Sequence, residues 1–237
     1  MSPSLAYLGY GRPKLNNSGT RNLFYWQKNS QQEQTDVKGA KDIKKGHSGL
    51  DKLSFVVNIL LAIWALLELY TLARHWTPHT PSRDKGSMFV IGLTVALAFF
   101  LADSVNLWAK GWNFPIPLAI RVLGLVIMIG GMIFRFYSIR LLGRFFTPVV
   151  TFQPEQTLIQ NGPYRYIRHP SYTGVWLVFI GLGLTTVGWI QFAVFSILPL
   201  LGLLYRIHVE ERMLLQVFGS QYRQYAAHTR KLIPFLF

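Results

Sequence analysis

The sequence contains no cysteine among its 237 residues. This absence excludes disulfide bonds, metal sites built from thiolates and cysteine nucleophiles. Charge is also scarce, since charged residues make up 14% of the chain, against roughly 25% in an average soluble domain. Acidic residues are the scarcer sign, with 10 Asp and Glu against 24 Lys and Arg. The net charge of +14 does not indicate nucleic-acid binding, because much of it flanks apolar blocks, where Lys and Arg meet phospholipid head groups.

The apolar residues, 51% of the chain, come in long blocks. About 20 consecutive apolar residues cross the roughly 30 Å hydrocarbon layer of a bilayer. Five blocks predict membrane spans, at residues 53–73, 88–109, 117–142, 172–187 and 189–207. The fourth is short, which predicts either a tight hairpin with the fifth or a helix that does not cross fully. The alternative is a soluble core, but every helix would then be apolar all round, which only very large soluble proteins arrange.

The sequence therefore predicts an all-α integral membrane protein with about five transmembrane helices, in three parts. Residues 1–50 are rich in Ser, Asn, Gln, Gly and Lys and predict a disordered basic tail. Residues 51–142 hold three spans. Residues 143–237 hold two more spans, a flanking loop and a charged interfacial helix that ends near Thr229. Basic residues near the span ends favour a multi-pass protein whose C-terminal side faces the cytoplasm, although the basic tail favours the other orientation.

Ionisable residues inside apolar blocks are costly and are therefore functional candidates. Glu68 and Asp103 lie near the ends of their blocks, where a hydrated or hydrogen-bonded residue is the simpler interpretation. His75 and His79 are four residues apart, as metal ligands on a helix would be, but Pro78 lies between them and interrupts a helix. We therefore predict no metal site.

Two groups of polar residues near the C-terminus carry more chemistry. Arg168-His169-Pro170 ends a loop and is followed by Tyr172. If a helix begins near Pro170, His169 and Tyr172 lie on one face at its N-terminus, where unpaired backbone N–H groups favour a carboxylate or phosphate. An interfacial aromatic belt with a capped helix start is the alternative.

The second group is Arg206 and Glu210, which are four residues apart and share a helix face where the fifth span meets water. Arginine can hold a carboxylate through two hydrogen bonds, and glutamate can hold a cationic or amine group. A structural ion pair at the membrane boundary is the alternative interpretation. The two groups lie at one membrane depth, which predicts a shared pocket without naming a reaction.

The stretch GPYRYIRHPSYTG at residues 162–174, followed by RIHVEERMLLQVFGSQYRQYAAHTRKLIP at residues 206–234, resembles the isoprenylcysteine carboxyl methyltransferase family and the related membrane phospholipid methyltransferases. The resemblance covers residues 143–234 and leaves the first two spans and the tail without a recognisable signature. It implies a methyltransferase that uses S-adenosylmethionine and is built from transmembrane helices without a Rossmann domain. The sequence agrees, because no strand followed by G-x-G-x-x-G occurs in it.

The resemblance also implies roles for individual residues. Arg206 corresponds to the arginine assigned to the substrate carboxyl group, and Glu210 to the cofactor-binding glutamate, so these two are the catalytic candidates. Gln156 stands where relatives often have histidine, which makes its contact the least secure. The residues implied to bind the cofactor are Gln156, Thr157, Leu158, Ile159, Tyr164, His169, Pro170, Ser171, Tyr172 and Glu210.

Three functions fit these observations. The first is carboxyl O-methylation of a lipophilic acceptor that enters from the bilayer, a reaction that needs no general base because a carboxylate is already ionised at neutral pH. The second is N-methylation of a phospholipid amine or another small amphiphile, which needs a base such as His208. The third is a transporter or membrane scaffold, which would not bind S-adenosylmethionine.

Overall fold

The computed structural model describes residues 19–75, 84, 86–108, 112–150, 157–186 and 188–233. Within these ranges the chain forms helices and no β-sheet, so the predicted all-α class is confirmed. The five α-helices are α1 (Gly19–Arg74), α2 (Ser87–Trp108), α3 (Leu118–Leu142), α4 (Pro170–Thr185) and α5 (Trp189–His228). Two 3-10 helices, η1 (Gly143–Phe145) and η2 (Gly162–Arg165), lie in the long segment between α3 and α4.

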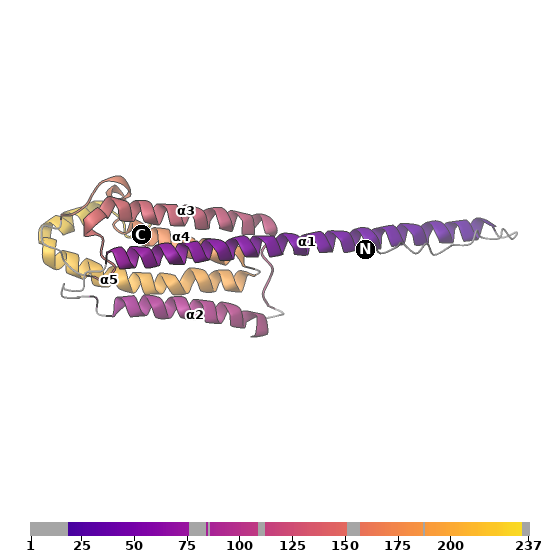
Figure 1. Ribbon diagram of the computed structural model, residues 1–237, viewed down its shortest axis with the longest axis horizontal. Coiled ribbons are helices and arrows are strands. Elements are labelled where there is room, and N and C mark those ends of the chain that lie inside the picture. The colour runs from indigo at the N-terminus through magenta and orange to yellow at the C-terminus, as the bar shows by residue number, and fades with distance from the viewer. Residues whose placement is uncertain are drawn as a thin grey trace, which may run out of the picture. The chain divides into compact units, whose positions relative to one another are not determined.

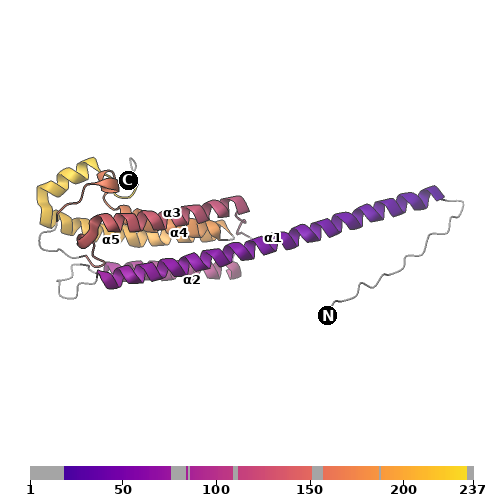
Figure 2. The ribbon, with the colours of Figure 1, turned by 45° about the horizontal axis from the view of Figure 1, so that its top comes forward.

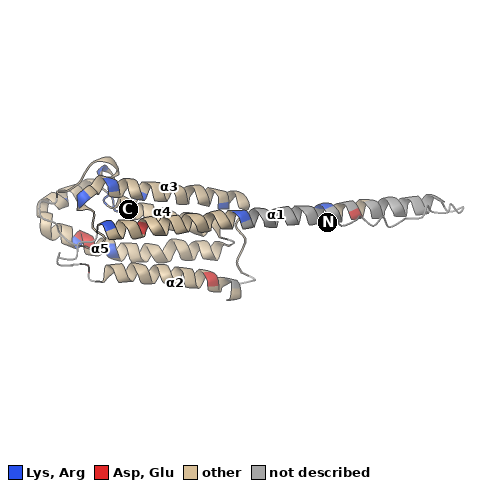
Figure 3. Ribbon diagram, in the orientation of Figure 1, with Lys and Arg blue, Asp and Glu red and all other residues tan. Residues whose placement is uncertain are grey.

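Four helical segments are long and apolar enough to cross a membrane, namely Lys52–Arg74, Ser87–Val105, Leu118–Phe145 and Trp189–His228. The fourth predicted span is α4, which has only 16 residues and is shorter than the about 20 residues of a full crossing. The chain is therefore a multi-pass integral membrane protein whose fourth apolar block is short, as predicted. Most charged residues that the structure describes lie near the ends of these helices (Figure 3).

The chain divides into two compact units, Met1–Lys52 and Leu53–Phe237. In the first unit α1 begins at Gly19, so a helix occupies much of the segment for which the sequence predicts a disordered tail. The segment from residue 19 to residue 52 has no proline and contains four Gln and six Lys residues, which are good helix formers. The expected disorder rests on the lack of apolar side chains alone, whereas helix propensity acts in the opposite direction. The described side chains there are exposed, at Gln31, Gln32, Glu33, Thr35 and Lys38.

The second unit is a helical bundle in which α3 packs on α4, α4 on α5, and α5 on α2 (Figures 1 and 2). Residues 53–74 of α1 join it through side chains, for example where the Trp64 ring meets the Phe179 ring edge-on at 5.6 Å between centroids. All five helices contribute to one buried apolar core, which includes Val57, Ala98, Met128, Val178 and Leu203.

Glycines bring α3 and α4 into close contact. A Cβ atom added to Gly131 would lie 2.8 Å from the carbonyl oxygen of Gly174 and 2.8 Å from the backbone nitrogen of Val178. Gly124 and Gly181 face each other in the same way, about two turns away along the two helices. Small residues at such positions let membrane helices approach and gain van der Waals contact, which drives helix association where lipid removes the hydrophobic advantage.

Gly131→Ala should therefore destabilise the bundle, by about 1–3 kcal/mol as for other overpacked sites. Gly130 is the matched control, because a Cβ atom there would meet nothing within 4 Å and alanine favours a helix. Thermal unfolding in detergent should show a lower midpoint for Gly131→Ala and an unchanged or higher midpoint for Gly130→Ala. Equal midpoints would contradict the close α3–α4 contact.

One ion pair lies inside the apolar part of the bundle. The Nε and Nη2 atoms of Arg135 in α3 donate to the two carboxylate oxygens of Glu68 in α1, with 2.7 Å between Nη2 and Oε2. Each charge thus satisfies the other, as the few ionisable groups inside membranes usually do. Glu68 is therefore hydrogen-bonded, in agreement with the simpler interpretation of its position.

Candidate functional site

The site begins where α4 begins. Pro170 is the first residue of α4, and His169 stands immediately before the helix, as the sequence predicts. Proline suits this position because its missing N–H would have no partner in the first turn. The rings of His169 and Tyr172 are stacked, with 5.6 Å between centroids and 17° between planes. The loop and the first turn of α4 thus present two adjacent aromatic rings.

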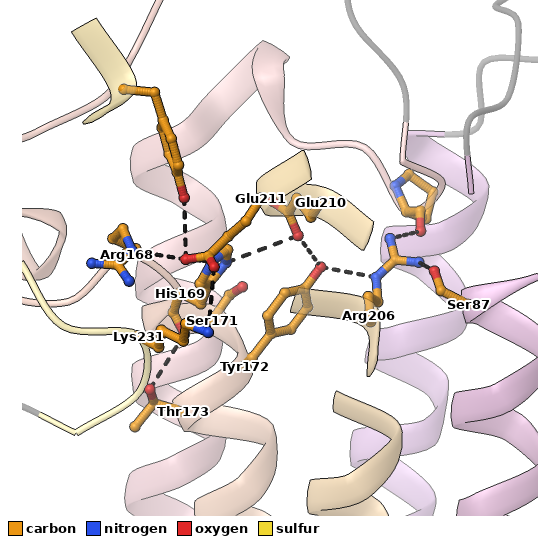
Figure 4. A network of polar contacts seen from close by, with 12 residues as sticks. Ser87, Arg168, His169, Ser171, Tyr172, Thr173, Arg206, Glu210, Glu211 and Lys231 are labelled. Carbon is orange, nitrogen blue, oxygen red and sulfur yellow. Dashed lines mark hydrogen bonds and ion pairs between the residues drawn. The ribbon is translucent and has the colours of Figure 1, made fainter. Parts of the chain in front are cut away.

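Tyr172 connects the two groups of polar residues that the sequence singles out. Its hydroxyl donates to Oε2 of Glu210 at 2.7 Å and accepts from Nε of Arg206 at 2.8 Å (Figure 4). Arg206 and Glu210 lie one turn apart on α5, so a single tyrosine of α4 bridges both. The predicted shared location of the two groups is confirmed.

Arg206 is buried and makes further hydrogen bonds beyond Tyr172. Its Nη1 atom donates to Oδ1 of Asp84 at 2.7 Å and to Oγ of Ser87 at 2.9 Å. Its Nη2 atom donates to the carbonyl oxygen of Pro148. A guanidinium has five N–H donors, so four are engaged by the described residues and one remains for a ligand.

Asp84 is the counter-charge of Arg206, and it lies three residues before the start of α2. Burial opposes its ionisation, but hydrogen bonds from the backbone N–H of Met88 and from the Ser87 hydroxyl, together with the Arg206 charge, lower the pKa of Asp84 below its ordinary value. The carboxylate is therefore ionised throughout the neutral range. From the sequence, the guanidinium of Arg206 is free to bind a substrate. In the structure it already donates a hydrogen bond to Asp84, a carboxylate of the same chain.

Glu211, next to Glu210, faces a different set of partners. Its Oε1 atom accepts from Nε of Arg168 at 2.8 Å and from the Tyr222 hydroxyl at 3.2 Å. Its Oε2 atom lies 3.5 Å from Nζ of Lys231. The two neighbouring glutamates thus have different partners. Glu210 points toward Tyr172, while Glu211 binds the loop before α4 to the C-terminal segment (Figure 4).

The C-terminal segment returns to the start of α4 because α5 bends. Gly219 has a φ of 53°, a conformation that glycine adopts without strain. Beyond α5, the backbone N–H groups of Arg168 and His169 donate to the carbonyl oxygens of Arg230 and Lys231 at 2.7 and 3.1 Å. The C-terminal residues therefore fix the loop that carries His169.

Most of the predicted cofactor-binding residues line one pocket, which we call the Tyr172 pocket. The predicted residues in its wall are Thr157, Leu158, Ile159, Tyr164, His169, Ser171, Tyr172 and Glu210. Pro170 is fully buried and is not part of the wall. Gln156 lies outside the described residues. Arg206 lines a small adjoining hollow that also contains Tyr172 and Glu210.

The pocket also has lining residues that sequence reasoning missed. They are Leu142, Phe145, Leu214, Phe218, Tyr222 and Tyr225. Arg168, which the sequence places in one group with His169, lines the pocket as well. Tyr222 and Tyr225 are three residues apart on α5, a spacing that places them on one helix face and could have drawn attention to them. The Tyr225 hydroxyl donates to the carbonyl oxygen of Tyr164 at 2.7 Å. No sequence pattern near Asp84 indicates its contact with Arg206, because 122 residues separate the two.

The Tyr172 pocket combines a carboxylate with buried polar and apolar groups. Nε2 of His169 is buried and makes no hydrogen bond to the described residues, although Oε1 of Glu211 lies 3.5 Å away. Burial and the nearby Glu210 charge raise the pKa of Tyr164, so its hydroxyl is neutral and donates to the carbonyl oxygen of Ser138. Such a pocket can take a molecule with a cationic group and an apolar or aromatic part.

A second, apolar cavity of about 460 Å³ within the helical bundle also has Tyr172 in its wall. Residues of α1, α2, α3, α4 and α5 line it, and Tyr172 and Arg206 form part of its wall. Its apolar lining includes Trp64, Leu72, Ile91, Val95, Val175, Phe179 and Leu203. Tyr172 therefore stands between a polar pocket and a lipophilic cavity.

Known protein families and relatives match the region of the chain that contains Tyr172, Arg206 and Glu210. The model of the isoprenylcysteine carboxyl methyltransferase (ICMT) family matches residues 122–216. Protein-S-isoprenylcysteine O-methyltransferase A of Arabidopsis thaliana is 32% identical over 115 residues, which are 48% of this chain and 58% of that protein. Methanethiol S-methyltransferase of Pseudomonas deceptionensis is 25% identical over 225 residues, which are 83% of this chain and 79% of that protein.

Among solved structures, that of a eukaryotic intramembrane Ras methyltransferase, an isoprenylcysteine carboxyl methyltransferase, aligns with a TM-score of 0.49 at 24% identity. The alignment covers 64% of this chain and 53% of that protein. The chain thus spans somewhat more than half the length of the Arabidopsis relative and of this structure.

Proposed function

We propose that the chain, whose residues 122–216 match the model of the isoprenylcysteine carboxyl methyltransferase family, is a membrane methyltransferase that methylates the carboxylate of a lipophilic acceptor, such as a prenylated cysteine. The family uses S-adenosylmethionine, which supplies a methyl group on a positively charged sulfur. We further propose that the active site faces the cytoplasm, since basic residues gather at the ends of the spans on the C-terminal side.

The observation that carries this proposal is the position of Tyr172. It lines both the polar Tyr172 pocket and the apolar cavity in the bundle. A water-soluble cofactor and a lipid-like acceptor need separate routes to one point, and the two hollows supply them. Holding the two reactants in line accounts for a large part of the rate in a bimolecular displacement.

The residues of the Tyr172 pocket fit the proposed cofactor. The Glu210 carboxylate suits its positive charge or its amino group, and the buried Nε2 atom of His169 still lacks a hydrogen-bond partner among the described residues. The apolar side chains of Leu142, Leu214 and Phe218 in the same wall suit a nucleoside and a thioether chain. We therefore propose that the predicted residues of this wall bind S-adenosylmethionine.

The chain needs no general base for this reaction. An oxygen of the acceptor carboxylate attacks the methyl carbon, a carbon–oxygen bond forms, and the carbon–sulfur bond breaks with its electrons remaining on sulfur. Arg206 has one donor left for the acceptor, because Asp84, Ser87, Tyr172 and Pro148 hold the others. A single hydrogen bond positions the carboxylate, and the Asp84 charge keeps Arg206 from stabilising it so strongly that it loses nucleophilicity.

The methanethiol S-methyltransferase aligns with most of this chain, which favours a small thiol as a second candidate acceptor. A thiol has a pKa of about 8.5 and must lose its proton before attack. The Tyr172 hydroxyl is already bound to Glu210, so such a proton could pass to water at the mouth of the pocket. N-methylation of a phospholipid amine, the alternative from sequence, requires proton removal as well.

Labelled methyl transfer to candidate acceptors separates these functions. Purified protein is incubated with methyl-labelled S-adenosylmethionine and a farnesylcysteine derivative, phosphatidylethanolamine or methanethiol. We expect label in the farnesylcysteine product and its release as volatile methanol by mild alkali, because esters hydrolyse whereas N-methyl and S-methyl groups do not. Alkali-stable product from the chosen acceptor would contradict carboxyl methylation, and no transfer to any acceptor would favour a non-enzymatic role.

A further inference from the structure

A third pocket lies at the opposite end of the bundle, and the proposed methyl transfer does not use it. It encloses about 300 Å³ between α1, α2, α3 and the α4–α5 connection. Arg121, after which we name it the Arg121 pocket, belongs to the first turn of α3. Leu142, in the wall of the Tyr172 pocket, lies 21 residues further along α3, or about 32 Å at 1.5 Å per residue. That distance is close to the thickness of the hydrocarbon layer.

Arg121 is a buried cation that forms no ion pair with any carboxylate of the described residues. Its side chain is 4% exposed, and its Nε atom donates to the carbonyl oxygen of Thr185 at 2.9 Å. Within the described part of the chain no carboxylate forms an ion pair with it, and this carbonyl is its only acceptor. A buried charge of this kind is costly unless it is paired. The N-terminal turn of α3 adds to that cost, because the helix dipole there is positive.

The carbonyl of Thr185 accounts for only one of the five N–H donors of Arg121. Arg121 is among the residues that line the pocket, so we infer that a ligand in the pocket reaches its other donors. A planar guanidinium binds phosphate through two parallel hydrogen bonds and is the side chain best suited to that anion. The Arg121 pocket therefore offers the binding geometry for a phosphate group at a membrane boundary.

A carboxylate, whose negative charge is opposite to that of Arg121, lines the same pocket. Asp103, near the end of α2, is exposed and forms no ion pair with any described residue. The other polar residues of the wall carry hydroxyl or amide groups and are Ser54, Asn58, Thr185, Thr186 and Gln191. The apolar residues of the wall are Val57, Leu61, Phe99, Ala102, Leu182 and Phe195. One anion site, one cation site and an apolar border match a zwitterionic phospholipid.

We propose that the Arg121 pocket binds the head group of a phospholipid with a protonated amine, such as phosphatidylethanolamine, with Arg121 on the phosphate and Asp103 on the ammonium group. The lipid is a structural ligand of the leaflet opposite the Tyr172 pocket. It is not the methyl acceptor, since Arg121 contacts Thr185, which lies 13 residues along α4 from Tyr172, or about 20 Å at 1.5 Å per residue. The proposal does not depend on the proposed reaction.

Lipid-dependent stability tests the site. Purified protein is stripped of lipid in detergent, and its unfolding midpoint is measured with and without each lipid. At a lipid concentration 100 times the dissociation constant, phosphatidylethanolamine should raise the midpoint by about 5–10 °C, and phosphatidylglycerol by less. Arg121→Gln should lose the rise with both lipids, relative to its own lipid-free midpoint. Asp103→Asn should lose the preference for phosphatidylethanolamine.

Arg140→Gln is the matched control, because Arg140 is an exposed arginine at the other end of α3 and should keep the full rise. Asp103 is exposed, so Asp103→Asn tests the proposal even if Arg121→Gln fails to fold. Native mass spectrometry of the unmodified protein should also show bound phosphatidylethanolamine. A full rise in Arg121→Gln, or an unchanged lipid preference in Asp103→Asn, would overturn the proposal. A full rise with inorganic phosphate alone would replace the lipid with a free anion.

Discussion

Glu210→Gln should weaken the binding of S-adenosylmethionine about 10- to 150-fold, while leaving the unfolding midpoint nearly unchanged. The glutamine amide can still accept the hydrogen bond from Tyr172, because it keeps one carbonyl oxygen and the same length. It loses the negative charge that faces the Tyr172 pocket. A hydrogen bond to a charged group contributes about 1.5–3 kcal/mol, and each 1.4 kcal/mol is a factor of ten. Calorimetric titration of the purified protein measures the change.

Glu211→Gln is the control for this substitution, since the two glutamates are neighbours with different partners. Glu211 binds Arg168, Tyr222 and Lys231, so its loss should lower the unfolding midpoint. Glu211→Gln should weaken cofactor binding less than Glu210→Gln does, and it should act through the loop before α4. The proposed role of Glu210 would be wrong if both variants bound S-adenosylmethionine equally, or if Glu210→Gln bound it as well as the unmodified protein.

Arg206→Lys should reduce methyl transfer by about 100-fold or more, although the positive charge is kept. Lysine has three donors on one atom and cannot serve Tyr172, Asp84, Ser87 and the Pro148 carbonyl at once. The Asp84 carboxylate would then lose the hydrogen bond from Nη1 of Arg206 in a buried setting. Breaking one side of a buried pair costs about 3–5 kcal/mol. Initial rates at saturating acceptor and cofactor show the loss as a fall in kcat.

Asp84→Asn distinguishes a positioning effect from a collapse of the fold. Without the Asp84 charge, Arg206 attracts an acceptor carboxylate more strongly, so the KM for an acidic acceptor should fall while kcat also falls. A merely structural Asp84 would lower stability without this opposite movement of KM. The pKa of Asp84 is held below its ordinary value, so the difference between this variant and the unmodified protein should be constant from about pH 5 to pH 8.

The sequence predicts the helices well because their cause is local. Bilayer thickness requires apolar blocks of a given length, and Pro170 marks the start of α4 without reference to any other part of the chain. Disorder in the N-terminal segment is harder to predict, since scarcity of apolar residues and high helix propensity argue in opposite directions there. The structure has a helix from Gly19.

The site is predictable only where its residues share a motif or a helix face. His169 and Tyr172 meet because they are three residues apart, and Arg206 and Glu210 because they are four apart. Asp84 lies 122 residues from Arg206 and reaches it only because α2 packs on α5. The same holds for Arg121, whose lack of an ion pair among the described residues becomes visible only once the neighbours of α3 are known.

The hydrogen bonds between the start of α4 and the C-terminal segment also set an order of events during synthesis. Synthesis runs from the N-terminus at about 5–20 residues per second, so residues 168–173 leave the ribosome before residues 229–232. Thr173 and the backbone of Arg168 and His169 bind the carbonyl oxygens of Leu232, Arg230 and Lys231. Until residues 229–232 have left the ribosome, the loop that carries His169 lacks these hydrogen bonds, so the Tyr172 pocket is completed only afterwards.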